Sequence, residues 1–396
     1  MDASTSTLPT ITLKPREDRR LRHGHLWVFS NEIAKVDGDA PAGTLVTVAA
    51  AHGAPLGVGI YNPHSLIAVR ITGGPGAPLD AEWFRSMIGR ALRLRSGLFP
   101  GGRTYRLLHS ESDGVPGVIV DRFDEVMVVQ TAAYGMEERR ELLYDALMEI
   151  DGIRGVVERN DHSLRLLEGL PSRVGVVRGT ADPQIIDDGV LRYHLDPLGG
   201  QKTGFYLDQR ANRIAMRPLM ARGRVLDLFS NNGGFALHAL HAGASEVIAV
   251  ESSAGAAVEI ERNRELNGLG PIDVRVADVF SELQDLRLRG EKFDCVIADP
   301  PPFARSKKNV AAARKKYVEL FSGSLRLLAP EGTAFLATCS HHIMRDTFLE
   351  IIRESLFRSG RSGIILEERG AAPDHPIHPM MPETGYLHAA ILRAGS

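Results

Sequence analysis

Hydrophobic positions divide the chain into regions of different periodicity. Up to about residue 73, short apolar runs at 44–48, 56–60 and 67–71 are separated by Gly, Pro, Asn and His, which predicts a small β domain. An amphipathic helix is predicted over 80–98, where arginines alternate with apolar positions at helical spacing. These patterns indicate a β-rich region followed by a basic helix.

The rest of the chain mixes strands and helices. Strand-like runs between 105 and about 190 flank a predicted helix over 136–150, and a further strand is expected near Leu166. From residue 191 onward, strand and helix patterns alternate throughout, which indicates a doubly wound α/β sheet. We therefore predict three domains, which span residues 1–75, 76–190 and 191–396.

The stretch 224–251 is the most informative part of the chain. A buried strand over 225–228 breaks at Ser230-Asn231-Asn232-Gly233-Gly234, where asparagine and glycine allow a tight turn with positive φ angles. A helix over 235–241 and a second strand ending at Glu251 follow. This order is half of a nucleotide-binding α/β unit, in which Glu251 can accept hydrogen bonds from both ribose hydroxyls.

The composition of the turn distinguishes between nucleotides. A dinucleotide site needs GxGxxG directly after the strand, so that the pyrophosphate lies on the helix N-terminus. Here a single Gly233-Gly234 pair follows Asp227, which would repel a pyrophosphate but suits the cationic amino-acid part of S-adenosyl-L-methionine (SAM). A third strand ends at Asp278, which can bind the amine of adenine. The sequence favours SAM over NAD, and a NAD-dependent oxidoreductase is the weaker alternative.

Two later strands carry candidate chemistry at their ends. Asp299 opens the segment DPPPF, whose rigid loop can face a planar base, a pattern typical of methyltransferases acting on nucleic acid or on amide nitrogen. The next strand ends in TCSHH, where Cys339 can act as a nucleophile and neighbouring histidines or cations can generate its thiolate. The alternative, a buried structural cysteine, suits Cys295 better, because Cys295 lies inside an apolar strand. No metal site is expected, because zinc-ligand spacing is absent.

Two basic segments are candidate RNA contacts. The first contains Lys14, Arg19, Arg20 and Arg22, and a solvated helix face followed by core aromatics explains it equally well. The second follows DPPPF and places six cations within twelve residues, which favours phosphate contacts. The predicted contacts in this segment are Arg305, Lys307 and Lys308.

Composition narrows the class of protein. The content of 43% hydrophobic and 24% charged residues describes a globular protein, and no apolar run approaches the ~20 residues of a membrane helix. The N-terminus lacks the apolar core of a signal peptide, and two cysteines form no disulfide framework, so we expect a cytoplasmic protein with no membrane partner. The net charge of -2 gives no global indication of nucleic-acid binding.

With these motifs, the chain resembles the bacterial large-subunit ribosomal RNA methyltransferase I family, which makes 5-methylcytosine. The resemblance covers nearly the whole length and includes LKP...GHLWVFSNEI, YRLLHSESDGVPGVIVDRF, GQKTGFYLDQR, LDLFSNNGGFALHAL, DPPPF, TCSHH and Asp374-His375-Pro376. It implies an N-terminal PUA domain that binds RNA, a central α+β domain and a C-terminal Rossmann-like class I SAM methyltransferase domain. The chain departs from the family at Pro302, where lysine is common, and at His341-His342, where Gly-Leu is common.

The resemblance also implies roles for individual residues. Asp227, Glu251 and Asp278 would hold SAM, Asp299 would meet the base, and Cys339 would be the nucleophile. The full set of predicted cofactor-binding residues is Phe205, Asp208, Gln209, Asp227, Phe229, Ser230, Asn232, Gly233, Gly234, Glu251, Ser252, Asp278, Val279 and Asp299.

The resulting hypothesis is a SAM-dependent methyltransferase that modifies cytosine C5 in 23S ribosomal RNA through a covalent Cys339 adduct. A base-nitrogen methyltransferase acting on guanine N7 would need no thiol, and a ribosome-assembly factor could retain SAM as a structural ligand only. The expected partner is ribosomal RNA of the large subunit, and the sequence also allows a homodimer.

Overall fold

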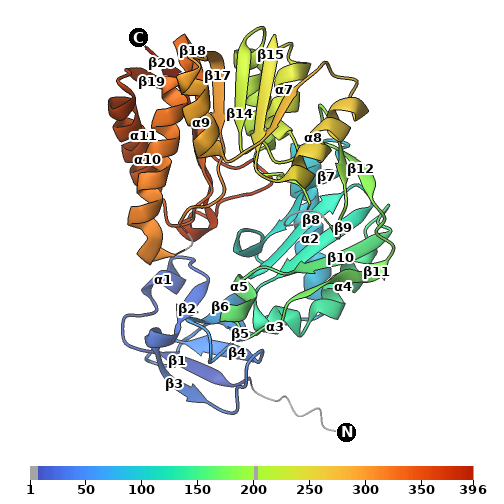
Figure 1. Ribbon diagram of the computed structural model, residues 1–396. Helices are drawn as coiled ribbons and strands as arrows, with labels where there is room; N and C mark the ends of the chain where they lie inside the picture. Colours follow the sequence, from blue (N-terminus) through green and yellow to red (C-terminus); the bar gives the residue numbers. More distant parts are fainter. Residues whose placement is uncertain (1–7, 200–203, 305, 396) are drawn as a thin grey trace. The chain divides into compact units, whose positions relative to one another are not determined.

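The computed structural model describes residues 8–199, 204–304 and 306–395 of the chain (Figure 1). Its contacts define two compact units, and the chain passes between them more than once. Unit 1 contains Met1–Gln184, Leu195–Leu207 and Asp374–Thr384. Unit 2 contains Ile185–His194, Asp208–Pro373 and Gly385–Ser396.

The N-terminal part of unit 1 is a six-stranded sheet in the order β2-β6-β5-β4-β1-β3. Its neighbours are antiparallel except for the parallel pair β1 and β4. The strands predicted from the apolar runs are β4, β5 and β6, and they enclose a small core that includes Ile11, Val28 and Val46. The elements are β1 (Thr10–Leu13), α1 (Arg19–Arg22), β2 (Trp27–Phe29), η1 (Ser30–Glu32), β3 (Ile33–Asp37), β4 (Leu45–Ala49), β5 (Pro55–Tyr61) and β6 (Ile67–Gly73).

The rest of unit 1 is built on a second sheet, in the order β11-β10-β9-β8-β7. Helix α2 begins where the sequence predicts, because the Asp80 carboxylate accepts a hydrogen bond from the Trp83 N–H at 2.9 Å. The elements are α2 (Ala81–Leu98), β7 (Thr104–His109), η2 (Ser110–Asp113), β8 (Val118–Phe123), β9 (Val126–Thr131), α3 (Tyr134–Glu137), α4 (Arg140–Met148), β10 (Gly155–Asn160), α5 (Leu164–Leu167) and β11 (Arg173–Gly179).

Two predictions in this region are wrong. The single helix over 136–150 is two helices, α3 and α4, and the guanidinium of Arg139 between them donates to the carbonyls of Gly43 and Gly135. The expected strand near Leu166 is the short helix α5, in which Leu166 is 73% exposed and joins no sheet. Local apolar patterns could not reveal either outcome, since tertiary contacts decide both.

Unit 2 contains a seven-stranded sheet in the order β16-β15-β14-β17-β18-β20-β19, preceded by a ribbon of β12 and β13. The first five strands are parallel, β20 pairs antiparallel with β18, and β19 pairs antiparallel with β20. The elements are β12 (Gln184–Asp187), β13 (Arg192–Leu195), α6 (Arg210–Met220), β14 (Arg224–Leu228), α7 (Gly234–His241), β15 (Glu246–Glu251), α8 (Ala254–Leu266), β16 (Asp273–Val276), α9 (Val279–Leu288), β17 (Phe293–Ala298), η3 (Lys307–Asn309), α10 (Val310–Arg326), β18 (Leu328–Thr338), α11 (Arg345–Ser359), β19 (Gly363–Arg369) and β20 (His388–Ala394), and η4 (Pro382–Thr384) lies in unit 1.

Helices cover both faces of this sheet, as the alternating pattern predicts (Figure 1). One core joins the strands to α9, α10 and α11, and a second core joins them to α6, α7 and α8. Because β14, β15, β17 and β18 are parallel, their carboxyl ends lie at one edge of the sheet. The strand order reverses between β14 and β17. In open α/β sheets, ligands bind at such a switch point.

Candidate active site

The turn after β14 has an unusual backbone. Phe229, Asn231 and Gly233 have φ angles of 61°, 51° and 88°. Asparagine and glycine adopt this left-handed region readily, as the sequence predicts, but a phenylalanine there is strained. The Ser230 hydroxyl donates to the Asp227 carbonyl at 2.7 Å and closes the turn. Strain of this kind is commonly found at ligand-binding sites.

Glu251, at the end of β15, is held in one orientation beside this turn. One carboxylate oxygen accepts a hydrogen bond from the Asn231 N–H at 2.9 Å. The other accepts from the Ser253 N–H at 2.9 Å and from the Ser252 hydroxyl at 3.3 Å. Glu251 as a whole is 9% exposed and its carboxylate is bound to neutral donors, a setting suited to receiving ligand hydroxyls as well.

Asp227 lies beneath the turn. Its side chain is 1% exposed, and its carboxylate accepts a hydrogen bond from the Ala236 N–H in the first turn of α7 at 2.9 Å. Burial raises the pKa of Asp227 to about 7, and the negative charge of Asp299 adds to this rise. Asp227 therefore supports the turn and the helix that follows.

The second glycine of the turn is explained by a buried arginine. A Cβ atom at Gly234 would lie 2.6 Å from Nε of Arg213, whose side chain is 3% exposed and lies over the Phe235 ring at 6.0 Å. Any side chain at position 234 would displace this guanidinium. Because Gly234 has no positive φ, this contact, and not the turn geometry, favours glycine at position 234.

Asn263 of α8 also holds the turn. Asn263 is fully buried. Its amide nitrogen donates to the Asn232 carbonyl at 3.1 Å, and its oxygen accepts from the His194 N–H at 2.8 Å. Asn267 bonds both the N–H and the carbonyl of Arg192. Only the packing of α8 against β13 reveals these bonds.

The start of α9 presents a carboxylate and an aromatic ring. Asp278 is exposed and caps the helix through one oxygen, which accepts from the Ser281 N–H at 3.0 Å. Val279, predicted as a cofactor contact, is 2% exposed and belongs to the core. The neighbouring Phe280 is half-buried, and its ring centroid lies 6.3 Å from that of Phe303.

The loop after β17 adds to this aromatic surface. Phe303 contacts Phe229 edge-on at 6.4 Å, and both rings are half-buried. Phe229, Phe280 and Phe303 therefore form a partly exposed aromatic cluster at the carboxyl edge of the sheet, next to Asp299. Aromatic faces can stack on planar bases. Phe280 and Phe303 are not among the residues predicted from the sequence, although Phe280 follows Asp278-Val279 and Phe303 ends the DPPPF segment.

A chain of hydrogen bonds leads to Asp299. Arg369 Nε donates to Asn212 Oδ1 at 2.7 Å, Asn212 Nδ2 donates to Gln209 Oε1 at 2.6 Å, and Gln209 Nε2 donates to Asp299 Oδ1 at 2.9 Å. A guanidinium can only donate, so Arg369 determines the orientation of both amides. Asn212 and Gln209 are almost completely buried. The relay therefore presents an N–H to Asp299 and restricts its orientation.

We predict that Asn212→Asp lowers the activity of the site roughly tenfold to a hundredfold without unfolding the protein. An aspartate can still accept from Arg369 but cannot donate to Gln209, so the Gln209 amide loses its fixed orientation. The measurement is kcat together with the melting temperature, and Asn31→Asp, an exposed amide-to-acid change in unit 1, is the control. A variant with unchanged kcat would show that the relay does not position Asp299.

The two cysteines have different environments. Cys295 is fully buried in β17, and burial raises the pKa of its thiol to about 12, which makes it a structural residue. Cys339 follows β18 and is half-buried, and its thiol donates to the Pro300 carbonyl at a distance of 3.6 Å. Pro300 directly follows Asp299, so the thiol and this carboxylate extend from adjacent strand ends.

Ser340 fixes the two loops to each other. Its hydroxyl lies 2.8 Å from the Tyr317 hydroxyl and accepts from the Ala304 N–H at 3.3 Å. These bonds connect the loop of Cys339 with the loop of Asp299 through residues that are almost fully buried. The thiol therefore sits on a rigid support.

The segment before α6 reaches the same edge. The Asp208 carboxylate accepts from the Tyr386 hydroxyl at 2.7 Å, and the Tyr386 ring lies 5.3 Å from the ring of His341. His341, one of the positions where the chain differs from the family pattern, thus adds an aromatic contact two residues after Cys339. Phe205 is buried in unit 1, whereas Asp208 belongs to unit 2. Residues 200–203 of the GQKTG motif lie outside the described residues.

Known proteins similar to this chain identify its family. The model of the S-adenosylmethionine-dependent methyltransferase family matches residues 176–380, and that of the PUA-like domain matches residues 11–72. The ribosomal RNA large subunit methyltransferases I of Vibrio cholerae and Aeromonas salmonicida are each 36% identical, over 96% of this chain and 98% of theirs. The chain belongs to this methyltransferase family. SAM is its cofactor.

A solved structure supports the fold of this methyltransferase. A putative methyltransferase crystallised with SAH is similar over 97% of this chain and 99% of its own, with a TM-score of 0.85 and 19% identity. The residues present at the sheet edge fit SAM. Carboxylates at the ends of β15 and β16 suit ribose hydroxyls and an adenine amine, the aromatic cluster suits a planar ring, and the turn lacks the glycine spacing for a pyrophosphate.

Some of the basic residues predicted to contact RNA already have partners within this methyltransferase. Arg20 pairs with Glu32 and lies over the Phe29 ring at 4.8 Å, and Arg22 pairs with Asp18 at 2.5 Å. Both arginines therefore have acidic partners within unit 1, and their role in RNA binding stays a prediction. Arg19 and Lys14 are exposed, although the Lys14 ammonium donates to the Asn31 carbonyl at 2.7 Å.

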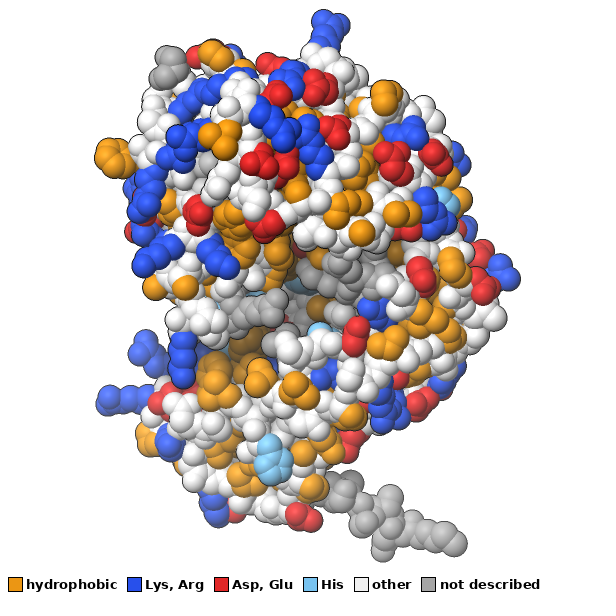
Figure 2. Space-filling model, viewed as in Figure 1, with side chains coloured by type: hydrophobic (Ala, Val, Ile, Leu, Met, Phe, Trp, Pro, Cys, Tyr) orange, Lys and Arg blue, Asp and Glu red, His pale blue; other side chains and the backbone are white. Residues whose placement is uncertain are grey.

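The second basic segment follows the Asp299 loop. Arg305 lies outside the described residues, Lys307 begins η3, and Lys308 is exposed. Figure 2 shows Lys and Arg side chains over α10 and α11, with acidic side chains among them. Arg314 of α10 forms an ion pair with Glu354 of α11 at 2.8 Å.

In the described residues, no helix is both long and apolar enough to span a bilayer. That part of the chain also contains no cluster of three His, Cys, Asp or Glu side chains able to hold a metal ion.

Proposed function

We propose that this methyltransferase modifies C5 of a cytosine in large-subunit ribosomal RNA. The observation that carries this proposal is the position of Cys339. Its half-buried thiol lies 3.6 Å from the carbonyl of Pro300, at the strand end next to Asp299. A methyltransferase acting on a base nitrogen needs no thiol there, whereas cytosine C5 requires nucleophilic activation.

The proposed reaction uses the thiolate of Cys339 twice. The sulfur adds to C6 of cytosine, which gives C5 the electron density of an enamine. SAM, when bound, supplies an electrophilic methyl group to C5. A base then removes the C5 proton, and the electrons of that C–H bond reform the C5–C6 double bond and expel the thiolate. The enzyme returns to its starting state.

Several residues support these steps. Glu251, Asp278 and the turn that follows Asp227 would hold the cofactor, and the aromatic cluster would receive a planar group. Asp299, oriented by Gln209, would accept a hydrogen bond from the amino group of cytosine. The remaining cofactor residues predicted from the sequence keep this role as part of the proposal.

The RNA substrate is inferred from the relatives. Those of Vibrio cholerae and Aeromonas salmonicida carry ribosomal RNA large subunit methyltransferase in their names, and residues 11–72 match a PUA-like domain. We assign RNA binding to residues 1–75, a connecting module to 76–190 and catalysis to 191–396. Action on ribosomal RNA implies a cytoplasmic location.

A labelling experiment tests both the RNA substrate and the base atom that receives the methyl group. The protein is incubated with SAM labelled on its methyl group and with 23S ribosomal RNA from cells lacking the protein, and the RNA is then digested to nucleosides. We expect the label in 5-methylcytidine. Label in 7-methylguanosine would favour the base-nitrogen reaction, and binding of SAM without any transfer would indicate an assembly factor.

A further inference from the structure

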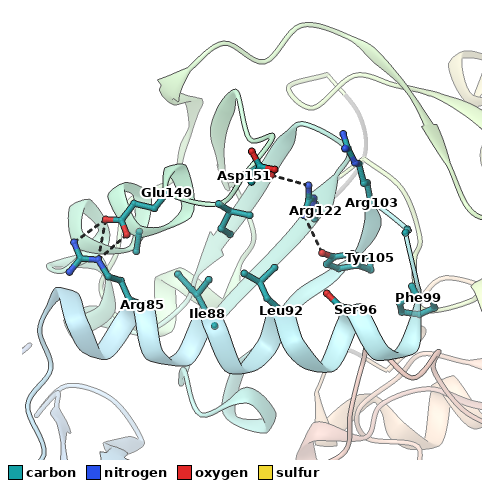
Figure 3. A pocket seen from close by; sticks show the side chains of 15 residues that line it. Arg85, Ile88, Leu92, Ser96, Phe99, Arg103, Tyr105, Arg122, Glu149 and Asp151 are labelled. Atoms are coloured by element: carbon teal, nitrogen blue, oxygen red, sulfur yellow. Dashed lines mark hydrogen bonds and ion pairs between the residues drawn. The ribbon is translucent and has the colours of Figure 1, made fainter.

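A groove in the central part of unit 1 has no role in the proposed reaction. It lies between α2, the start of the β7–β8 hairpin and the C-terminal end of α4, and has a volume of about 610 Å³ (Figure 3). This volume is within the range of small-molecule sites. All of its lining residues lie between Arg85 and Asp151, so the groove belongs to one compact unit.

Arg122 forms part of the wall at one end and is 92% buried. Its guanidinium donates to the Tyr105 hydroxyl at 3.3 Å and the Asp151 carbonyl at 3.5 Å (Figure 3). It also donates to the Asp124 carbonyl at 3.1 Å. These partners are neutral oxygens, and no ion pair of Arg122 occurs among the described residues. Buried charges are normally paired, so an anion at this end of the groove would be stabilised.

The guanidinium of Arg103 lies near that of Arg122 at the same end of the groove. A Cβ atom built on Gly152 would lie 3.8 Å from a terminal nitrogen of Arg103 and 3.9 Å from one of Arg122. Arg103 pairs with Asp124 at 3.6 Å, but both side chains are exposed, so this pair is weak and a competing anion could replace it. Two guanidiniums at one end of a groove are suited to a phosphate group.

The middle of the groove is apolar, and its far end is closed. Ile88, Leu92 and Ile150 line the middle, and Arg85 and Glu149 close the far end with a bidentate pair at 2.9–3.1 Å. Phe99 and Tyr105 stack at 6.2 Å, with an angle of 8° between their rings, beside the two guanidiniums. An apolar surface next to a phosphate site matches the shape of a nucleotide.

Gly89 keeps this groove open. It lies in the interior of α2, where glycine costs roughly 1 kcal/mol relative to alanine. Packing does not require it, since a Cβ atom there would meet only an Arg93 nitrogen, at 3.6 Å. A side chain at position 89 would instead extend into the groove.

We propose that this groove binds a nucleoside monophosphate unit, with its phosphate between Arg103 and Arg122 and its base against Leu92 and Ile150. The unit is either a free nucleotide or one nucleotide of an RNA strand, and only the second source rests on the proposed RNA substrate.

The test compares binding of AMP and of a short oligoadenylate to the full-length protein, by calorimetry and fluorescence anisotropy. Neither probe contains cytosine, so neither reports on the target base. Gly89→Met fills the groove with a residue that favours helix, and Gly97→Met makes the same change on α2 away from the groove. Arg103→Gln removes an exposed cation from the groove, and Arg90→Gln is its matched control.

We expect Gly89→Met and Arg103→Gln each to raise the Kd about tenfold, while both controls stay within about twofold of the wild type. If AMP and oligoadenylate both follow this pattern, the groove accepts free nucleotides. If oligoadenylate alone binds and follows it, the source is an RNA strand. Equal affinities for all variants, or no binding of either probe, would overturn the proposal. Methyl transfer to ribosomal RNA is measured separately, so failure of the cytosine chemistry would not affect this result.

Discussion

Cys339→Ala should abolish methyl transfer, with a loss of more than about a thousandfold in kcat, while SAM binding stays within about twofold of the wild type. Without the sulfur, C6 of cytosine receives no nucleophile and C5 does not become reactive. The side chain is half-buried and packs against the edge of the core without belonging to its buried residues, so the fold should persist. The measurements are transfer of labelled methyl groups to ribosomal RNA and calorimetric titration with SAM.

Cys295→Ala is the matched control for this variant. It removes the other thiol of the chain from a fully buried position and should cost roughly 1–3 kcal/mol of stability while preserving methyl transfer. Substrate RNA containing 5-fluorocytidine provides a second readout, because fluorine cannot leave as a proton does and the thiol adduct should accumulate. Full activity of Cys339→Ala, or an adduct that forms without Cys339, would refute the covalent route.

The second large effect concerns stability as a function of pH. Burial raises the pKa of Asp227 to about 7 in the folded protein, whereas the pKa of an unfolded aspartate is about 3.9. The folded state therefore binds more protons between these values. The stabilisation is complete below about pH 4 and is lost as the pH rises through about 7, a total change of about 4 kcal/mol.

Asp227→Asn should remove this dependence, because a neutral amide keeps an oxygen for the Ala236 N–H and does not titrate. Between about pH 5 and pH 8, the free energy of unfolding of the wild type should fall by about 3 kcal/mol more than that of the variant. Urea denaturation of the SAM-free protein measures this difference. Asp285→Asn, a change at an exposed position, serves as the control. Equal pH slopes for the wild type and Asp227→Asn would contradict the assignment.

Much of the candidate site was predictable because it depends on local order along the chain. A parallel sheet brings the carboxyl ends of its strands to one edge, so residues such as Glu251, Asp299 and Cys339 can be assigned to that edge once the strands are recognised. The apolar neighbours of Cys295 and the polar neighbours of Cys339 also separated the two thiols in advance. Their environments in the structure agree with that distinction.

Other features depend on contacts between residues distant in sequence. Asn212 lies 157 residues from Arg369, and the relay between them exists only because α6 packs near the end of β19. The buried position of Asn263 depends on the packing of α8 against β13, where its side-chain oxygen accepts from the His194 N–H. Gly234 resembles a turn glycine, although the guanidinium of Arg213 is what excludes a side chain there.

From the sequence by itself, the α/β alternation was recognisable, SAM was favoured over NAD, and the acids and the thiol could be assigned to strand ends, because alternation and turn chemistry are local properties. The domain classes were expectations from the family resemblance. The tertiary structure decided which polar groups are buried and which partners they find. Burial and hydrogen bonding depend on every element packed against a residue, and no local pattern records them. The half-buried state of Phe280 beside the buried Val279, and the burial of Arg122 in the wall of its groove, are results of that packing.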